Sequence, residues 1–216
     1  MKLAIVGASG GIGRLLVTQA VAAGHTVTAI ARPSSTVDAP AGVTVARGAL
    51  DDVAFLAGAF AGCDAVLSSL GLRLPGLAPW AKAEEPDFLD RSTPALGAAM
   101  KQAGVRRLLF VSSSGVGDSA AILPGFFKVF VAVTAMRSVF PALDRMEQAF
   151  FASGLDVCAV RPTGLSDGPP TGKVVVPTKL VGQAQIPRAD VAAWMLDAVG
   201  KPTLPKSVVL TVTGAG

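Results

Sequence analysis

The stretch KLAIVGASGGIG, residues 2–13, joins a short apolar run to a turn whose glycines follow the spacing G-x-x-G-x-x-G. Residues 3–6 predict a buried strand, and residues 11–23 predict a helix that ends at Gly24. Glycines at such a junction allow a sharp turn, a close approach of the backbone to a pyrophosphate, and tight packing of helix on strand. The free N–H groups at the helix N-terminus then face the anion. The stretch therefore predicts a dinucleotide-binding turn.

The rest of the chain alternates short apolar runs with amphipathic stretches. We expect strands at residues 26–30, 43–46, 65–68, 107–111, 157–160 and 207–212, and helices at 52–60, 88–103, 141–152 and 188–199. Uniformly apolar strands that alternate with helices imply a parallel sheet covered on both faces. The expected fold is a single Rossmann-type α/β domain over residues 1–216, doubly wound, with a mostly parallel sheet and a small C-terminal substrate-side portion. Ligands of such folds bind at the carboxyl ends of the strands.

The composition allows one large core and argues against several kinds of partner. The chain has 216 residues, of which 51% are hydrophobic, and a net charge of +4 carried by scattered basic residues. The basic residues form no block, so the sequence does not predict a nucleic-acid-binding surface. The apolar stretch at residues 120–140 is interrupted by Pro124, Gly125, Lys128 and Arg137, so we do not expect a membrane span. We expect a cytoplasmic protein, a monomer or homodimer, that acts on a small molecule.

The two cysteines, Cys63 and Cys158, are expected to be core residues. Cys63 comes just before a predicted strand and Cys158 lies inside one. Thiols in such positions of an intracellular protein are usually buried and reduced. Two cysteines and one histidine cannot form an ordinary four-ligand zinc site without carboxylates, so no metal is expected.

The residues after the second predicted strand indicate which dinucleotide binds. Domains that bind NAD usually place an Asp or Glu about 20 residues after the glycine turn, where it holds the ribose 2′-hydroxyl. Here the first acidic residue is Asp38, whereas Arg32, Ser34 and Ser35 stand at the end of the strand. Arg32 can pair with a 2′-phosphate through charge-assisted hydrogen bonds. We therefore predict NADP(H), the alternative being that Arg32 is a solvated loop charge.

The same turn also fits the nucleophile elbow of a hydrolase, because residues 7–11, GASGG, match G-x-S-x-G. A catalytic triad requires a histidine, and the chain has only His25. We expect His25 to be a surface residue at the turn into the second strand, at the opposite edge of the sheet. An oxyanion loop would also have to fit into the six residues before the turn. These two points argue against a hydrolase.

Six segments spread along the chain carry a family resemblance. They are GASGGIG (7–13), AGHTVTAIAR (23–32), AGCDAVLSSLG (61–71), GVRRLLFVSSSGVG (104–117), ASGLDVCAVRPTGLSDGPPTG (152–172) and IPRADVAAWML (186–196). With them the chain resembles the atypical short-chain dehydrogenase/reductases, and among these the NAD(P)H-binding, NmrA-like group that includes biliverdin-IXβ reductase, also a flavin reductase.

The resemblance implies where the cofactor lies. It assigns the phosphates to the glycine turn, the 2′-phosphate to the end of the second strand, and the nicotinamide to the ends of the fifth and sixth strands. The implied cofactor-binding residues are Gly7, Ser9, Gly10, Gly11, Ile12, Arg32, Ser35, Leu50, Ser69, Leu70, Gly71, Ser112, Pro162, Thr163, Gly164 and Leu165. Family members often carry an adenine-binding Asp where this chain has Ala49, so we expect Leu50 or the backbone to contact the adenine.

The chain departs from the family in its proton donors. It contains no tyrosine, so the Tyr-x-x-x-Lys chemistry of most short-chain dehydrogenases cannot operate. A lysine that the group often carries before residue 152 aligns with Leu143. Without tyrosine, catalytic histidine or metal, the oxidation of an ordinary alcohol has no evident general base. Hydride transfer to a flavin, quinone or tetrapyrrole-like acceptor is easier, because the charge delocalises over the π-system and water can supply the proton.

The candidate catalytic residues are Ser112, Ser113 and Glu147. The serines end the fifth strand and can orient the acceptor or the nicotinamide; alternatively they only cap backbone groups or bond the nicotinamide ribose. Glu147 is the carboxylate expected near the site, as a proton relay or as one half of an exposed salt bridge.

The expected substrate wall consists of Arg73, Trp80, Phe126 and Phe130. Trp80 can stack on a planar substrate, and the phenylalanines can form an apolar lid. The alternatives are a helix buried against the core or a partner subunit, and for Arg73 a solvated charge.

Three functions remain open at this point. The first is an NADPH-dependent reductase of a conjugated small molecule such as a flavin, quinone or tetrapyrrole. The second is a non-catalytic redox sensor that binds NADP(H), suggested by the few candidate catalytic residues. The third, a sugar-nucleotide epimerase-like enzyme, is weakened by the missing tyrosine and the short C-terminal half.

Overall fold

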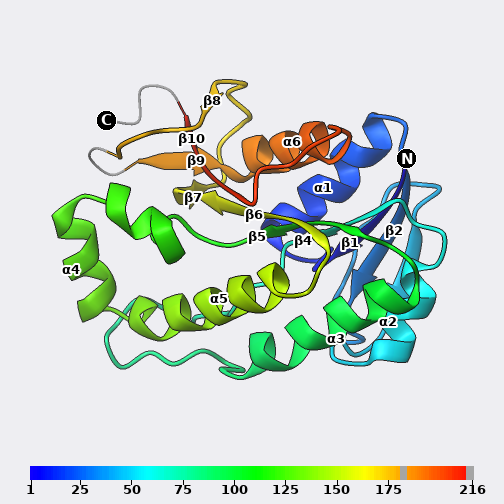
Figure 1. Cartoon of the computed structure of the whole chain (residues 1–216), viewed down its shortest axis with the longest axis horizontal. Helices are drawn as coiled ribbons and strands as arrows, with labels where there is room; N and C mark the ends of the chain where they lie inside the picture. The colour runs from blue at the N-terminus through cyan, green and yellow to red at the C-terminus, as the bar shows by residue number, and fades with distance from the viewer. Residues whose placement is uncertain (181–183, 213–216) are drawn as a thin grey trace.

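The computed structural model describes residues 1–180 and 184–212, and its centre is an eight-stranded sheet of order β3-β2-β1-β4-β5-β6-β10-β8 (Figure 1). A two-stranded sheet of β7 and β9 lies beside it. The strands are β1 (Lys2–Val6), β2 (Thr26–Ala31), β3 (Thr44–Arg47), β4 (Ala65–Ser68), β5 (Arg107–Val111), β6 (Asp156–Pro162), β7 (Gly164–Ser166), β8 (Val174–Val175), β9 (Gln185–Pro187) and β10 (Ser207–Val212). Neighbouring strands of the large sheet are parallel, except that β8 pairs antiparallel with β10.

Helices cover both faces of this sheet (Figure 1). They are α1 (Gly11–Ala22), α2 (Val53–Phe60), α3 (Phe88–Gln102), α4 (Gly125–Val133), α5 (Met136–Phe151) and α6 (Arg188–Val199), with a 3₁₀ helix at Gly117–Ile122. One core cluster packs α1 and α6 on the first face, and the other packs α2, α3 and α5 on the second. Because β1 and β4 bury side chains on both faces, their sequences are apolar without alternation. The predicted doubly wound α/β fold is confirmed.

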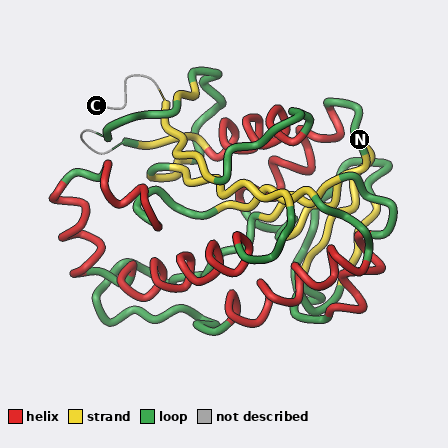
Figure 2. The backbone as a smooth tube through the Cα atoms, in the orientation of Figure 1, coloured by secondary structure: helices red, strands yellow, loops and turns green. Residues whose placement is uncertain are grey.

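The strand order reverses between β1 and β4. From β1 the chain builds outward through β2 and β3, then crosses back to place β4 on the other side of β1. The connections that leave β1 and β4 therefore diverge to opposite faces and open a crevice at the carboxyl ends of the strands. The glycine turn follows β1, and the irregular connection over residues 69–87 follows β4 (Figure 2).

The C-terminal half differs from expectation at the start of α5, at three short strands, and at the 3₁₀ helix and α4, which were not among the expected helices. The predicted helix at 141–152 begins five residues earlier, at Met136, and Pro141 lies within it. Proline favours the first helical turn, so the sequence placed the start there, but α5 continues through it. The strands β7, β8 and β9 were not predicted, because two or three residues are too few to show a periodic pattern.

The apolar stretch around residues 120–140 forms no straight span. Within residues 1–180 and 184–212, no single helix is long and apolar enough to cross a membrane. Helices α4 and α5 reach the required length and composition only together, and the chain bends by 104° between them.

Cys63 and Cys158 are free thiols buried in the two different core clusters, as predicted. Desolvation raises the pKa of both, and for Cys158 it raises the pKa to about 12. Such thiols stay protonated and unreactive at neutral pH.

Candidate functional site

The glycine turn has the geometry that its sequence predicts. Gly7 adopts a left-handed conformation with φ +80°, which favours glycine. A Cβ on Gly13 would lie 2.1 Å from the carbonyl oxygen of Gly7, so the first turn of α1 packs directly on the backbone of the loop. Gly10, the N-cap of α1, has no side chain to cap the helix. The first N–H groups of α1 are therefore available to an anionic ligand.

Ser69 fastens the end of β4 to this turn. Its N–H donates to the carbonyl oxygen of Val6 over 2.9 Å, and its hydroxyl lies 3.2 Å from the carbonyl oxygen of Gly7. A Cβ on Gly7 would lie 2.9 Å from the Ser69 hydroxyl, so the missing side chain of Gly7 makes room for this contact. Ser69 therefore supports the turn as well as lining the crevice above it.

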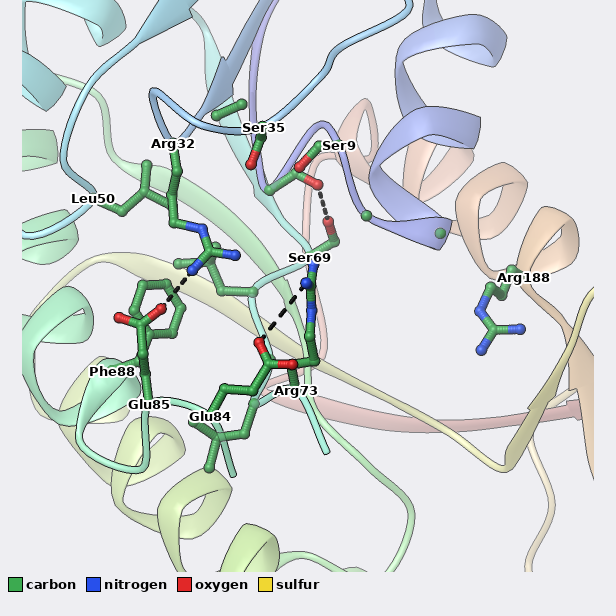
Figure 3. A pocket seen from close by; sticks show the side chains of 17 residues that line it. Ser9, Arg32, Ser35, Leu50, Ser69, Arg73, Glu84, Glu85, Phe88 and Arg188 are labelled. Carbon is green, nitrogen blue, oxygen red and sulfur yellow. Dashed lines mark hydrogen bonds and ion pairs between the residues drawn. The ribbon is translucent and has the colours of Figure 1, made fainter. Parts of the chain in front are cut away.

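A cavity of about 480 Å³ opens over the turn and along the crevice (Figure 3). It brings together most of the residues that the sequence assigned to the cofactor. Its lining includes Gly7, Ser9, Gly10, Gly11, Arg32, Ser35, Leu50, Ser69, Leu70, Gly71 and, from the expected substrate wall, Arg73. The cavity is therefore a continuous candidate nucleotide site that runs from the end of β2 to the start of α1.

Arg32 lies in the wall of this cavity and is already paired. Its Nη1 lies 2.5 Å from Oε1 of Glu85, and its guanidinium lies 5.9 Å from the ring centroid of Phe88. Both partners come from the connection between β4 and α3 or the start of α3 (Figure 3). Arg73 faces the same cavity and lies 3.7 Å from Glu84. Arg32 is thus not an isolated solvated charge, whereas Arg73 is 69% exposed and remains a solvated charge with a distant partner.

A smaller cavity of about 230 Å³ shares the glycine-turn end of the first, where Gly11 and residues 69–72 line both. Ile12, Ser112 and Leu165, all assigned to the cofactor, line it together with Val139 and Leu143 of α5. The Ser112 hydroxyl is buried and has no hydrogen-bond partner within the described chain. Because an unpartnered buried hydroxyl costs about 1–3 kcal/mol, it is a candidate ligand contact.

A third cavity, of about 470 Å³, is largely apolar. The predicted Phe126 and Phe130 line it, with Phe127 between them on α4. Thr163 and Gly164 line this cavity, whereas Leu165 lines the smaller one. The short segment at the end of β6 therefore runs between the two.

Four predicted site residues line none of these cavities. Pro162 is buried in β6, where its carbonyl oxygen accepts from the N–H of Ser114. The Ser113 hydroxyl donates to the carbonyl oxygen of Ser114 over 3.3 Å, so it caps a backbone group. Trp80 is 82% exposed and stacks on nothing in the described chain. The fourth residue is Glu147.

Glu147 forms a buried ion pair instead of facing the substrate. Its two oxygens accept from Arg161 over 2.9 Å and 2.6 Å, and the side chains of Glu147 and Arg161 are 0% and 4% exposed. Arg161 also donates to Asp118, which is 84% exposed, over 2.5 Å. The expectation of an exposed salt bridge is wrong, because the side chain turns inward from α5 to β6. Glu147 lines none of the three cavities and both its oxygens bond Arg161, so it is not positioned to relay a proton to them.

Arg188 is a cavity residue that sequence reasoning missed. A Cβ on Gly11 would lie 2.9 Å from its Cδ, so the side chain lies across the start of α1. Its guanidinium lies 2.7 Å from Asp167 and lines both the large and the small cavity. Figure 3 shows it beside α1, on the opposite side from Arg32. The sequence could have indicated Arg188, because it stands between a strand and a helix, β9 and α6, at the edge of the fold where ligands bind.

His25 lies where the sequence placed it. It precedes β2 at the amino end of the strand, and its Nδ1 lies 3.2 Å from the N-terminal amine. The glycine turn lies at the carboxyl ends of the strands, so the hydrolase hypothesis has no histidine at the site.

Solved structures of other proteins share this fold. The chain is similar in structure to ChuY, an anaerobilin reductase from Escherichia coli O157:H7 (TM-score 0.78, 24% identity, covering 100% of this chain and 99% of ChuY). It is also similar to a short-chain dehydrogenase/reductase from Veillonella parvula DSM 2008 in complex with NADP (TM-score 0.78, 18% identity, covering 99% and 95%). A Rossmann-fold NAD(P)-binding family protein from Shigella flexneri is 25% identical (TM-score 0.66, covering 99% and 94%).

A family model described as NAD(P)H-binding matches residues 7–202, which include the glycine turn, Arg32, Ser69, Ser112 and Arg188. The match covers most of the 216 residues. It confirms the NAD(P)H-binding group that the six sequence segments indicate. The chain belongs to the NAD(P)H-binding family.

Proposed function

We propose that this protein is an NADPH-dependent reductase that delivers hydride to a conjugated small molecule, such as a flavin, a quinone or a tetrapyrrole. The observation that carries the proposal is the buried, unpartnered hydroxyl of Ser112 in a cavity continuous with the glycine turn. The similarity to ChuY, an anaerobilin reductase, supports a tetrapyrrole-like acceptor.

The described residues fit a phosphorylated dinucleotide. The glycine cradle leaves no room for a Cβ on Gly13 and offers uncapped N–H groups to the pyrophosphate. Arg188 lies across the same helix start, with its guanidinium in the cavity wall, and adds a positive charge there. Arg32 supplies the cation for the 2′-phosphate, and Leu50 an apolar surface for the adenine. When NADPH is bound, it supplies the hydride.

The residues of the small cavity then perform two tasks. Val139, Leu143 and Leu165 provide an apolar wall that suits a flat acceptor. The Ser112 hydroxyl donates to the acceptor or to the nicotinamide amide and fixes its orientation. Because Leu143 replaces the lysine often found at this position and the chain has no tyrosine, solvent supplies the proton. This limited chemistry favours acceptors that delocalise the incoming charge.

A panel of acceptors tests the proposal. Purified protein should oxidise NADPH in the presence of FMN, riboflavin, a quinone or a linear tetrapyrrole, and should be much less active on simple ketones. Tight NADPH binding without turnover of any acceptor would instead favour the second candidate, an NADP(H)-binding redox sensor. That candidate is favoured by α4, whose Phe126, Val129 and Val133 are exposed apolar residues that a partner can cover.

Substituting Ser112→Ala should lower kcat about tenfold to a hundredfold, because one oriented donor at the reacting groups is lost. The Kd for NADP⁺ should change by less than about threefold, since the main phosphate contacts remain. Stopped-flow measurement of NADPH oxidation separates the two effects. Ser113→Ala is the matched control, because Ser113 lines none of the cavities and its hydroxyl donates to the backbone carbonyl of Ser114, so this variant should retain turnover. Equal losses in the two variants would contradict the role of Ser112.

Substituting Arg32→Ala should weaken NADPH binding far more than NADH binding, by about 1.5–3 kcal/mol for a charged hydrogen bond. Fluorescence titration with both reduced cofactors measures this difference. Arg106→Ala removes the same charge from an exposed position at the amino end of β5, so it should leave both affinities unchanged. Equal losses for NADPH and NADH in Arg32→Ala would exclude a 2′-phosphate contact.

A further inference from the structure

We propose that Glu85 is an internal competitor of the cofactor's 2′-phosphate and sets the preference between NADP(H) and NAD(H). This inference rests on the proposed function, since it requires the 2′-phosphate to bind Arg32. It goes beyond that function because it states that Glu85 controls how strongly NADP(H) is preferred over NAD(H).

The geometry places Glu85 at the cation that the phosphate needs. Its Oε1 lies 2.5 Å from Nη1 of Arg32, and both residues line the large cavity (Figure 3). The side chains of Arg32 and Glu85 are 36% and 44% exposed, so a ligand in the cavity can reach the pair. Phe88 packs under the guanidinium and keeps it at this end of the cavity. The site is thus already filled by an anion of the chain itself.

A carboxylate affects the two cofactors differently. The 2′-phosphate carries a charge of about −1.5 to −2 near pH 7, so it must displace Glu85 from Arg32 or bind beside a like charge. The 2′-hydroxyl of NAD(H) is neutral and can donate a hydrogen bond to the same carboxylate. Glu85 therefore weakens NADP(H) binding while it leaves NAD(H) binding unaffected or slightly strengthened.

A second arginine offers Glu85 an alternative partner. Nη2 of Arg91 lies 3.5 Å from its Oε2, and Arg91 also pairs with Asp51 and Asp87. Glu85 can therefore give up Arg32 and still face a positive charge. It lies in the irregular connection of residues 69–87, so its side chain can turn without breaking a helix or strand. The 2′-phosphate can therefore displace Glu85 from Arg32 at a small cost in free energy. Glu85 should thus weaken NADP(H) binding without preventing it.

The neighbouring Glu84 provides a matched control. It lines the same cavity but pairs with Arg73, at 3.7 Å, and not with Arg32. Glu84→Gln and Glu85→Gln remove the same charge from the same cavity. Only Glu85→Gln frees Arg32. A difference in nucleotide affinity between the two variants therefore reports the competition for Arg32 and not the loss of one negative charge from the cavity.

The test measures the Kd of NADP⁺ and NAD⁺ for the wild type, Glu85→Gln, Glu84→Gln, Arg32→Ala and the Arg32→Ala/Glu85→Gln double variant by calorimetry. Glu85→Gln should tighten NADP⁺ binding about fivefold, the effect of an exposed ion pair, and leave NAD⁺ unchanged or weaker. Glu84→Gln should keep the NADP⁺/NAD⁺ ratio within about twofold of wild type. In the Arg32→Ala background, Glu85→Gln should no longer change the ratio, because Glu85 acts through Arg32.

Each contrary result has a distinct meaning. An unchanged ratio in Glu85→Gln, or the same shift in both glutamine variants, overturns the competition while leaving the NADP(H) site intact. A shift that persists in the Arg32→Ala background also overturns it. Failure of the wild-type protein to bind either nucleotide overturns both the competition and the proposed function.

Discussion

Replacing Gly13 with alanine should destabilise the protein by about 3 kcal/mol or more and abolish nucleotide binding. A Cβ there would lie 2.1 Å from the carbonyl oxygen of Gly7, and no side-chain rotation can relieve a clash with backbone. Either α1 moves away from β1 or the turn opens, and both changes displace the N–H groups that face the anion. Urea denaturation, followed by circular dichroism, and titration with NADP⁺ measure the two effects.

Gly58→Ala is the control for this substitution. Gly58 lies on the exposed side of α2, and a Cβ there meets no atom within 4 Å. Alanine at that position should stabilise the helix by about 0.5–1 kcal/mol. A Gly13→Ala variant that unfolds at the wild-type urea concentration and still binds NADP⁺ would show that the turn is looser than its geometry indicates.

Replacing Glu147 with leucine should cost about 3–5 kcal/mol, because it leaves the buried guanidinium of Arg161 with only the solvent-exposed Asp118. Replacing both partners with apolar residues, as Glu147→Leu/Arg161→Met, should recover most of the loss. Asp118→Ala removes the exposed arm and should cost less than about 1 kcal/mol. Urea denaturation of the four proteins gives the comparison.

The same variants decide what Glu147 does. If it fastens α5 to β6, turnover per folded molecule of Glu147→Leu should stay close to wild type below the unfolding transition. A loss of turnover with unchanged stability would instead restore the proton relay.

Local sequence patterns predicted the frame of the molecule well. The strands at residues 3–6 and 65–68 are buried on both faces, so their apolar runs identify them without knowledge of their neighbours. The glycines of the turn are dictated by backbone geometry, which is also local. These features account for the fold and for the floor of the cofactor site.

Side-chain partners distant in sequence could not be predicted in the same way. Arg32 meets Glu85, 53 residues further along the chain, through a connection with no regular structure. Arg188 comes to lie across Gly11 from the far end of the sequence. For Glu147, helical periodicity placed it on α5 but could not show whether the side chain faces the cavity or β6. The carboxylate of Glu147 suggested a proton relay, whereas the packing places it in an ion pair with Arg161.

The contact of Ser69 with the glycine turn also orders events during synthesis. Residues 1–13 are synthesised before β4, yet the turn at Gly7 is held by the hydroxyl of Ser69, which follows 62 residues later. Strand β1 pairs with β4 as well as with β2, so its second edge stays open until β4 emerges. Non-local pairing of this kind delays folding and leaves an apolar strand exposed on the nascent chain. The glycine turn is therefore complete only after β4 has been synthesised, and a chain that ends before β4 should not hold a nucleotide.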